Sequence, residues 1–274
     1  MLKQRIITAV ILLPLVIAGI LLLIRPLFAL FSFVIIIGIG GWEWARMAGY
    51  EKVQSRLLFI LSLSTLAGIV YGYNDVFFPT VMSVALIWWG VALVLMVSYQ
   101  QKTGFYQKNE WIFTVAAHIV LVSAWWFLTK LHAFNAQWIL YLLLLIVIAD
   151  TAAYFSGKRF GKRKLAPELS PGKTIEGVMG AVFGVLLWSI LAIVFFNVPS
   201  HYWLYFVLLS LLTALISVGG DLFISMMKRE ADLKDSGSIL PGHGGLLDRI
   251  DSLLAALPLF TIGLVWASLQ SLSG

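Results

Sequence analysis

The stretch Ser225–Asp251, SMMKREADLKDSGSILPGHGGLLDRID, is a dense polar island in a chain that is 61% hydrophobic. The segments on either side of it, 202–224 and 250–270, are apolar and long enough to cross a bilayer. A membrane protein places this much charge at a membrane boundary either to meet water or to act on something charged. The island therefore predicts membrane-crossing helices and marks the side on which chemistry would take place.

Composition supports an all-α, polytopic integral membrane protein. Only 12% of the 274 residues are charged, and a soluble domain of this length could not hide so much apolar surface. The chain has no cysteine, which excludes disulfides, thiolate nucleophiles and cysteine-ligated metals. Its net charge of +6 is explained by Lys and Arg residues in cytoplasmic loops, which are expected to contact anionic lipid headgroups. No nucleic-acid partner is therefore predicted.

About nine membrane spans are predicted from apolar runs of sufficient length. They are 6–24, 27–45, 57–73, 77–97, 111–129, 136–156, 175–197, 202–224 and 250–270. The first is read as a retained span, because it is too long for a typical signal peptide core and no clear cleavage site follows. Arg25-Pro26 should form a tight hairpin between the first two spans. We divide the chain into N-terminal membrane helices, 1–135, and a C-terminal catalytic region, 136–274.

The basic residues orient these spans. With the N-terminus in the cytoplasm, only Arg25 and Lys130 of the 19 Lys and Arg residues fall on the opposite side. The polar loops 157–174 and 225–249 then both lie in the cytoplasm. We therefore expect a protein of the cytoplasmic, or inner, membrane whose active site faces the cytoplasm.

Acidic residues gather at the cytoplasmic ends of the last four predicted spans. Asp150 and Asp221 lie inside apolar runs, where a carboxylate costs roughly 2.5–3.5 kcal/mol at the bilayer centre and less near the interface. Glu176 opens the seventh span, and Asp248 and Asp251 open the ninth. Several acids at one depth suggest a shared polar pocket.

Helical periodicity places Asp221, Ser225, Lys228 and Asp232 within about 60° on one face. The eighth span would then project an acidic and basic stripe past the membrane surface. The alternative is a solvated helix end with ordinary pairs between successive turns.

These residue types favour magnesium and phosphate chemistry. Carboxylate oxygens without cysteine, and with only His243 of the four histidines near the acids, suit Mg²⁺ rather than zinc. Magnesium usually bridges one or two carboxylates and substrate phosphates, which nearby lysines and arginines would hold. The pattern indicates phosphoryl or nucleotidyl transfer.

Three loop motifs are less specific. Ser170–Thr174 contains Gly-Lys-Thr, but Pro167 stands where a P-loop needs glycine, so it is either a phosphate-binding helix start or a simple turn. The basic residues in 158–164 are expected to anchor the chain on anionic lipid. The turn Pro241–Gly245 would let the backbone approach a ligand or another segment closely.

The polar island resembles the signature of the phosphatidate cytidylyltransferases, also called CDP-diacylglycerol synthases. The matching residues are Ser225, Met227, Lys228-Arg229, Lys234-Asp235, Gly237, Leu240-Pro241, His243-Gly244-Gly245, Leu246, Asp248-Arg249, Ile250 and Asp251. The segments 150–154, 170–177 and Gly220-Asp221 are also similar to family blocks. The specific resemblance covers about 140–265, and the N-terminal half resembles the family only in length and hydropathy.

The resemblance implies a helical homodimer that makes CDP-diacylglycerol and pyrophosphate from CTP and phosphatidate, with a divalent metal. It also implies that Asp221 and Asp248 surround the metal centre.

Our hypothesis places one or two Mg²⁺ ions at Asp221 and Asp248, with Asp150 as a further ligand or an outer group. Together with Lys173, these three aspartates form the expected catalytic set. The residues expected to bind CTP or phosphate are Lys173, Lys228, Arg229, Lys234, His243 and Arg249.

Three alternatives remain. The first is a CTP-dependent transferase for another lipid phosphate. The second is a secondary transporter with Asp150 and Asp221 as ion sites, although the acids crowd one membrane side and no inverted repeat is visible. The third is a non-catalytic membrane scaffold, which would leave the polar loops unexplained.

Overall fold

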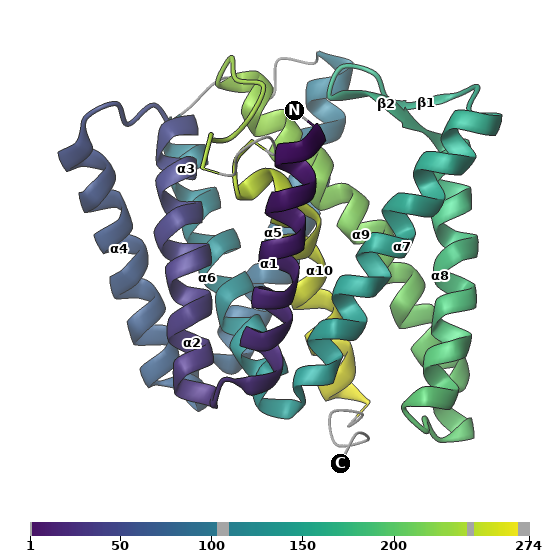
Figure 1. Ribbon diagram of the computed structural model, residues 1–274. Coiled ribbons are helices and arrows are strands. Elements are labelled where there is room, and N and C mark those ends of the chain that lie inside the picture. The colour runs from purple at the N-terminus through teal and green to yellow at the C-terminus, as the bar shows by residue number, and fades with distance from the viewer. Residues whose placement is uncertain (1, 103–109, 240–243, 268–274) are drawn as a thin grey trace.

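A computed structural model describes residues 2–102, 110–239 and 244–267 and confirms the all-α membrane architecture (Figure 1). Within these residues, eight helices are long and apolar enough to cross a membrane, and they coincide with the second to ninth predicted spans. The first predicted span falls on α1 (Leu2–Leu22), which is not among these eight helices. The count of nine therefore stays a prediction.

The remaining helices follow α1 in chain order. They are α2 (Arg25–Phe33), the π-helix η1 (Val34–Gly40), α3 (Gly41–Met47), α4 (Val53–Gly72), α5 (Asn74–Gln101), α6 (Glu110–Phe134), α7 (Ala136–Phe160), α8 (Ile175–Phe195), the 3₁₀ turn η2 (Ser200–Tyr202), α9 (Trp203–Glu230) and α10 (Leu247–Trp266). The break between α1 and α2 lies at Leu23-Ile24, just before the predicted Arg25-Pro26, and proline occupies the first turn of α2. The span Arg25–Met47 is a single rod in which η1 joins α2 to α3.

A small antiparallel hairpin was not predicted. Strand β1 (Lys164–Ala166) pairs with β2 (Ser170–Thr174), with Lys164 opposite Thr174 and Ala166 opposite Ser170. The strands are too short and too polar to produce the alternating pattern by which strands are recognised in sequence. The hairpin leads directly into α8 and so carries Lys173 to the end of the bundle.

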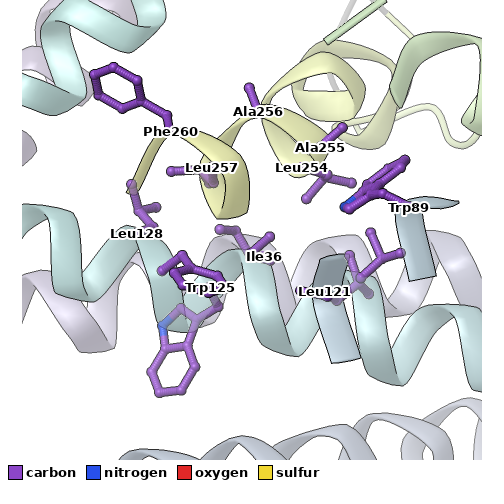
Figure 2. Packing of buried hydrophobic residues seen from close by; sticks show 14 of the residues in the cluster. Ile36, Trp89, Leu121, Trp125, Leu128, Leu254, Ala255, Ala256, Leu257 and Phe260 are labelled. Carbon is purple, nitrogen blue, oxygen red and sulfur yellow. The ribbon is translucent and has the colours of Figure 1, made fainter. Parts of the chain in front are cut away.

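Two helices form the centre of the bundle. In α6 and α10, 72% and 67% of the most apolar window is buried, against 22% in α4, which lies at the periphery. Figure 2 shows Leu254 and Leu257 of α10 packed near Leu121 and Leu128 of α6. The start of α10 is therefore held by a rigid core on which a site can be built.

Small residues bring α7 and α8 into close contact. A Cβ atom added to Gly177 would lie 2.9 Å from the carbonyl oxygen of Ala153, and one added to Gly184 would lie 2.9 Å from Cβ of Ala152. In membranes, such small residues let helix backbones approach each other. The close packing fixes α7, which carries Asp150, against the helix that follows Lys173.

The polar segments lie at one end of the bundle. The beginning of α1, the β1–β2 hairpin, the end of α9 and the beginning of α10 lie together, whereas α10 ends at the opposite side (Figure 1). This arrangement agrees with the sidedness derived from the basic residues. That this end faces the cytoplasm stays a prediction.

Candidate active site

Two lysine–aspartate pairs form the centre of the site. Nζ of Lys173, on β2, lies 2.6 Å from Oδ2 of Asp221 on α9. Nζ of Lys228, near the end of α9, lies 2.6 Å from Oδ1 of Asp248 in the first turn of α10. Four predicted site residues, distant in sequence, are thus brought together as two ion pairs at one end of the bundle.

Asp221 is partly exposed and has two polar contacts among the described residues. Besides Lys173, it accepts a 3.3 Å hydrogen bond on Oδ1 from the hydroxyl of Ser225, one helical turn further along α9. Asp150 on α7 is exposed and lies close enough to both Lys173 and Asp221 to interact with their charges. The third predicted aspartate therefore belongs to the surroundings of Asp221.

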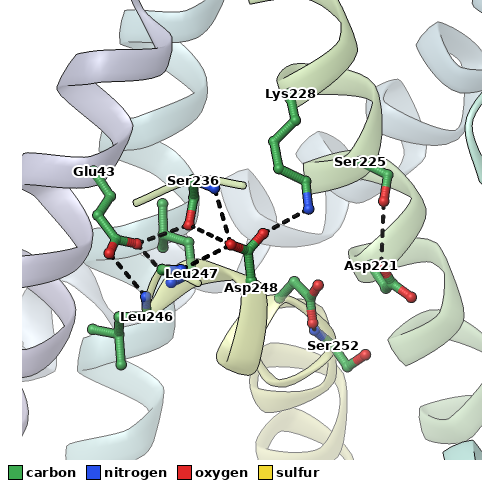
Figure 3. Close-up of polar contacts among 11 residues, drawn as sticks. Glu43, Asp221, Ser225, Lys228, Ser236, Leu246, Leu247, Asp248 and Ser252 are labelled. Carbon is green, nitrogen blue, oxygen red and sulfur yellow. Dashed lines mark hydrogen bonds and ion pairs between the residues drawn. The ribbon is translucent and has the colours of Figure 1, made fainter. Parts of the chain in front are cut away.

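Asp248 is held by several donors (Figure 3). Its Oδ2 accepts hydrogen bonds from the backbone N–H of Ser236 at 2.9 Å and from that of Gly245 at 3.0 Å. The hydroxyl of Ser236 lies 3.1 Å from the same oxygen. Lys228 completes the set on Oδ1, so residues from both described ends of the loop between α9 and α10 contact this carboxylate.

Asp251 is a site residue to which the sequence analysis gave no role. Its side chain is largely buried, accepts a 2.7 Å hydrogen bond from the N–H of Ser252, and interacts electrostatically with Asp221. Gly220 makes this possible, because a Cβ there would lie 2.6 Å from the carbonyl oxygen of Asp251 and would hold α9 away from α10. The spacing of three residues between Asp248 and Asp251 on one helix was the available signal.

Other predicted residues lie at the rim or outside the described chain. Arg229, Lys234 and Arg249 are exposed. His243 lies outside the described residues. The predicted stripe on α9 ends earlier than expected, because α9 ends at Glu230 and Asp232 adopts a left-handed backbone with φ of 55°.

The Gly-Lys-Thr segment proves to be the second strand of the hairpin and the start of α8. The hydroxyl of Thr174 accepts a 3.1 Å hydrogen bond from Gly177 N–H and so caps α8, which leaves Lys173 as the group directed to the site. In the basic cluster, Arg163 pairs with Glu176 and Lys164 donates to the carbonyl of Pro171. These two cations stabilise the hairpin.

An apolar pocket of about 460 Å³ lies between helices and the hairpin. It is lined by α5, the hairpin, α8 and α9, through residues that include Leu93, Met96, Leu165, Val178, Leu215 and Leu222. Leu222 follows Asp221 directly in α9, and the hairpin carries Lys173.

The donor chemistry suits a hard cation. Asp221 and Asp248 each already hold a positively charged ammonium group at 2.6 Å, which shows that a cation can be seated on either carboxylate. In the described part of the chain, no three Asp, Glu or His side chains converge closely enough to enclose a metal. Magnesium commonly takes only one or two protein carboxylates and completes its shell with water and substrate phosphates, so these residues fit it.

Glu43 is the residue that sequence reasoning missed entirely. It lies on α3, only 2% exposed, and its carboxylate contacts the loop that surrounds Asp248. The signal was present, because an acid inside the apolar run 27–45 is as costly as Asp150 or Asp221 in theirs.

Comparison with known proteins gives consistent matches over nearly the whole chain. The sequence model of the cytidylyltransferase family matches residues 3–266. The chain is 40% identical over 274 residues to the phosphatidate cytidylyltransferase of Pseudomonas aeruginosa, with 98% of each chain covered. It is 38% identical to that of Haemophilus influenzae, covering 95% of this chain and 98% of the relative, and 33% identical to that of Bacillus subtilis, covering 93% and 95%. The similarity thus extends into the N-terminal half, and limiting it to residues 140–265 was too narrow.

Proposed function

The chain belongs to the cytidylyltransferase family, and from this premise we infer that it transfers CMP from CTP to phosphatidate, giving CDP-diacylglycerol and pyrophosphate. The observation that carries the inference is similarity to phosphatidate cytidylyltransferases along almost the full length of both chains. The paired lysines and aspartates at one end of the bundle supply the charges that such a reaction needs.

The chemistry is a displacement at phosphorus. A phosphate oxygen of phosphatidate bonds to the α-phosphorus of CTP, and the bond from that phosphorus to the oxygen bridging to the β-phosphate breaks. The electron pair leaves with pyrophosphate. Since the attacking phosphate is already anionic at neutral pH, no strong base is required, and the main obstacle is repulsion between two anions.

The residues of the site lower this repulsion. Lys173 and Lys228 would move from their aspartates to phosphate oxygens when substrates bind, with Arg229, Lys234 and Arg249 at the rim as further phosphate contacts. Asp221 and Asp248 would then be free to hold Mg²⁺, with Asp150 and Asp251 close to Asp221. Bound magnesium would stabilise negative charge on the α-phosphate and on pyrophosphate. One or two ions suit the two aspartates.

The apolar pocket between α5, the hairpin, α8 and α9 supports a lipid substrate. We propose that acyl chains of phosphatidate lie against Leu93, Leu215 and Leu222 while its phosphate lies at the charged end of the bundle. The charged end of the bundle would face the cytoplasm of an inner membrane, where CTP is available. The homodimer implied by the family resemblance stays a prediction.

Purified protein in detergent should form labelled CDP-lipid from labelled CTP and phosphatidate when Mg²⁺ is present, and EDTA should stop the reaction. A panel of lipid phosphates with matched chains tests the choice of lipid. A higher kcat/KM for a phosphate other than phosphatidate would reassign the substrate. Failure to form any CDP-lipid with active-site aspartates intact would overturn the proposed activity.

A further inference from the structure

Glu43 contacts both described ends of the loop between α9 and α10, although about two hundred residues separate it from them in sequence. Its Oε1 accepts a 2.9 Å hydrogen bond from Leu246 N–H, and its Oε2 accepts one of 2.9 Å from Leu247 N–H. The hydroxyl of Ser236 lies 2.9 Å from Oε2. Figure 3 shows this carboxylate reaching from its own helix to the first residues of α10.

The start of α10 compensates the buried carboxylate. Among the described residues, no Lys, Arg or His lies within ion-pair distance of Glu43. The first N–H groups of a helix lack intrahelical acceptors and carry the positive end of the helix dipole. Leu246, at the N-cap of α10, has no side chain that can accept them. Glu43 therefore caps this helix from a distant part of the chain.

The surrounding backbone is shaped for this contact. A Cβ atom on Gly245 would lie 2.6 Å from Oε2 of Glu43, and one on Gly237 would collide with Oε1. The helix that carries Glu43 is fixed by its neighbour Trp44, whose indole N–H donates to the carbonyl of Phe113 at 2.9 Å. A π-helix, η1, immediately precedes α3, and such segments often re-aim side chains at functional sites.

One loop residue, Ser236, contacts both Glu43 and Asp248. The Ser236 hydroxyl lies within hydrogen-bond distance of both carboxylates, and its single hydrogen can serve one at a time. The Ser236 and Gly245 N–H groups donate to Asp248. We propose that Glu43 is a positioning residue, which holds the two ends of this loop against α10 and thereby orients Asp248 for the transfer reaction. This proposal rests on the proposed role of Asp248.

The kinetic test compares Glu43→Gln with Glu51→Gln, which changes an exposed carboxylate in the same half of the chain. In Glu43→Gln, the side-chain NH₂ group would face a backbone N–H group. Two donors cannot form a hydrogen bond with each other, so the loop should shift. Because misplacement of a reacting group by about 1 Å can cost a hundredfold, kcat should fall about 100-fold. The KM for phosphatidate should stay within about threefold, because its chain pocket lies elsewhere. Glu51→Gln should retain full activity, and Glu43→Asp should recover part of kcat.

A labelling experiment reports on the loop directly. Since the chain has no cysteine and Ser236 is fully buried, Ser236→Cys provides a single thiol that should react slowly with a maleimide. Adding Glu43→Gln should speed labelling at least about tenfold, whereas adding Glu51→Gln should not. Ser189→Cys, buried in α8, is the control for general unfolding and should stay unreactive with Glu43→Gln. If both thiols become reactive, Glu43→Asp replaces the amide variant in the same comparison.

Unchanged labelling of Ser236→Cys in the Glu43→Gln background would overturn the proposal, whatever the activity. Faster labelling in the Glu43→Gln background, together with full activity of Glu43→Gln, would also overturn the proposal. In that case the role given to Asp248 would be wrong. Faster labelling with a reduced kcat would support it. If the unmodified protein forms no CDP-lipid, the proposed function is wrong, and this result is distinct from the outcomes of the labelling experiment.

Discussion

The two lysine–aspartate pairs have the same length but different surroundings. In the Lys228–Asp248 pair the side chains are 13% and 8% exposed, and Asp248 receives backbone donors from Ser236 and Gly245. In the Lys173–Asp221 pair the side chains are 23% and 29% exposed, and the only other donor seen on Asp221 in the described chain is the hydroxyl of Ser225. The first pair is built into the loop, whereas the second can open with little loss of structure.

This difference separates two roles for similar chemistry. A buried charge that loses its partner is costly, because its desolvation is no longer compensated. A half-exposed charge is rehydrated easily when its partner leaves. The Asp248 pair should therefore contribute to folding as well as to catalysis, and the Asp221 pair mainly to substrate binding.

Asp248→Asn should have the largest effect. The amide presents hydrogens to Lys228, Ser236 or Gly245 and removes the charge, so activity should fall at least about 10³-fold, equivalent to ~4 kcal/mol in activation free energy. CDP-lipid formation per inserted protein is the measurement. Asp232→Asn is the matched control, because that position is exposed and asparagine tolerates its left-handed backbone. Activity near that of the unmodified protein would reject a catalytic role for Asp248.

Asp221→Asn should reduce activity about 100-fold and raise the Mg²⁺ concentration needed for half-maximal rate. Its melting temperature in detergent should change less than that of Asp248→Asn, because fewer donors are seen on Asp221 in the described chain. Equal losses of melting temperature in the two variants would contradict the contrast between the pairs.

The two lysines should separate binding from stability. Lys173→Ala should raise the KM for CTP about tenfold and more than the KM for phosphatidate, as expected for loss of one charged phosphate contact. A larger rise in the KM for phosphatidate than for CTP would reassign Lys173.

Lys228→Ala leaves Asp248 buried without its cation and should destabilise the protein by roughly 3 kcal/mol, measured by thermal unfolding.

Leu215→Trp should narrow the apolar pocket between α5, the hairpin, α8 and α9. We expect the KM for long-chain phosphatidate to rise about fivefold while the KM for CTP stays unchanged, because the polar contacts lie outside the pocket. Short-chain phosphatidate serves as the control substrate and should be affected less. An equal effect on all chain lengths would place the acyl chains elsewhere.

The smallest effect is expected at the exposed Lys102–Glu168 pair, which provides the baseline for the other two. Its side chains are 73% and 46% exposed, and such surface pairs contribute roughly 0–1 kcal/mol. Lys102→Ala should leave CDP-lipid formation unchanged and shift thermal unfolding very little. A shift in thermal unfolding as large as that of Lys228→Ala would show that burial does not explain why the ion pairs differ in their contribution to stability.

Long apolar runs and the positions of charges determined much of the fold. Each predicted span from 27–45 to 250–270 became a helix, because a membrane-crossing segment must satisfy its own backbone hydrogen bonds. The polar residues that stand out in these runs, including Asp150, Asp221 and Asp248, were recognised because burying charge in hydrocarbon requires a reason.

Only the tertiary structure decided which of these groups meet. The partnership of Lys173 with Asp221 depends on a short hairpin that periodicity does not reveal, and Glu43 caps a helix formed by residues two hundred positions away. The approach of α9 to α10 at Gly220 likewise depends on tertiary packing. Residue spacing defines faces on one helix, but packing between helices sets which faces come together.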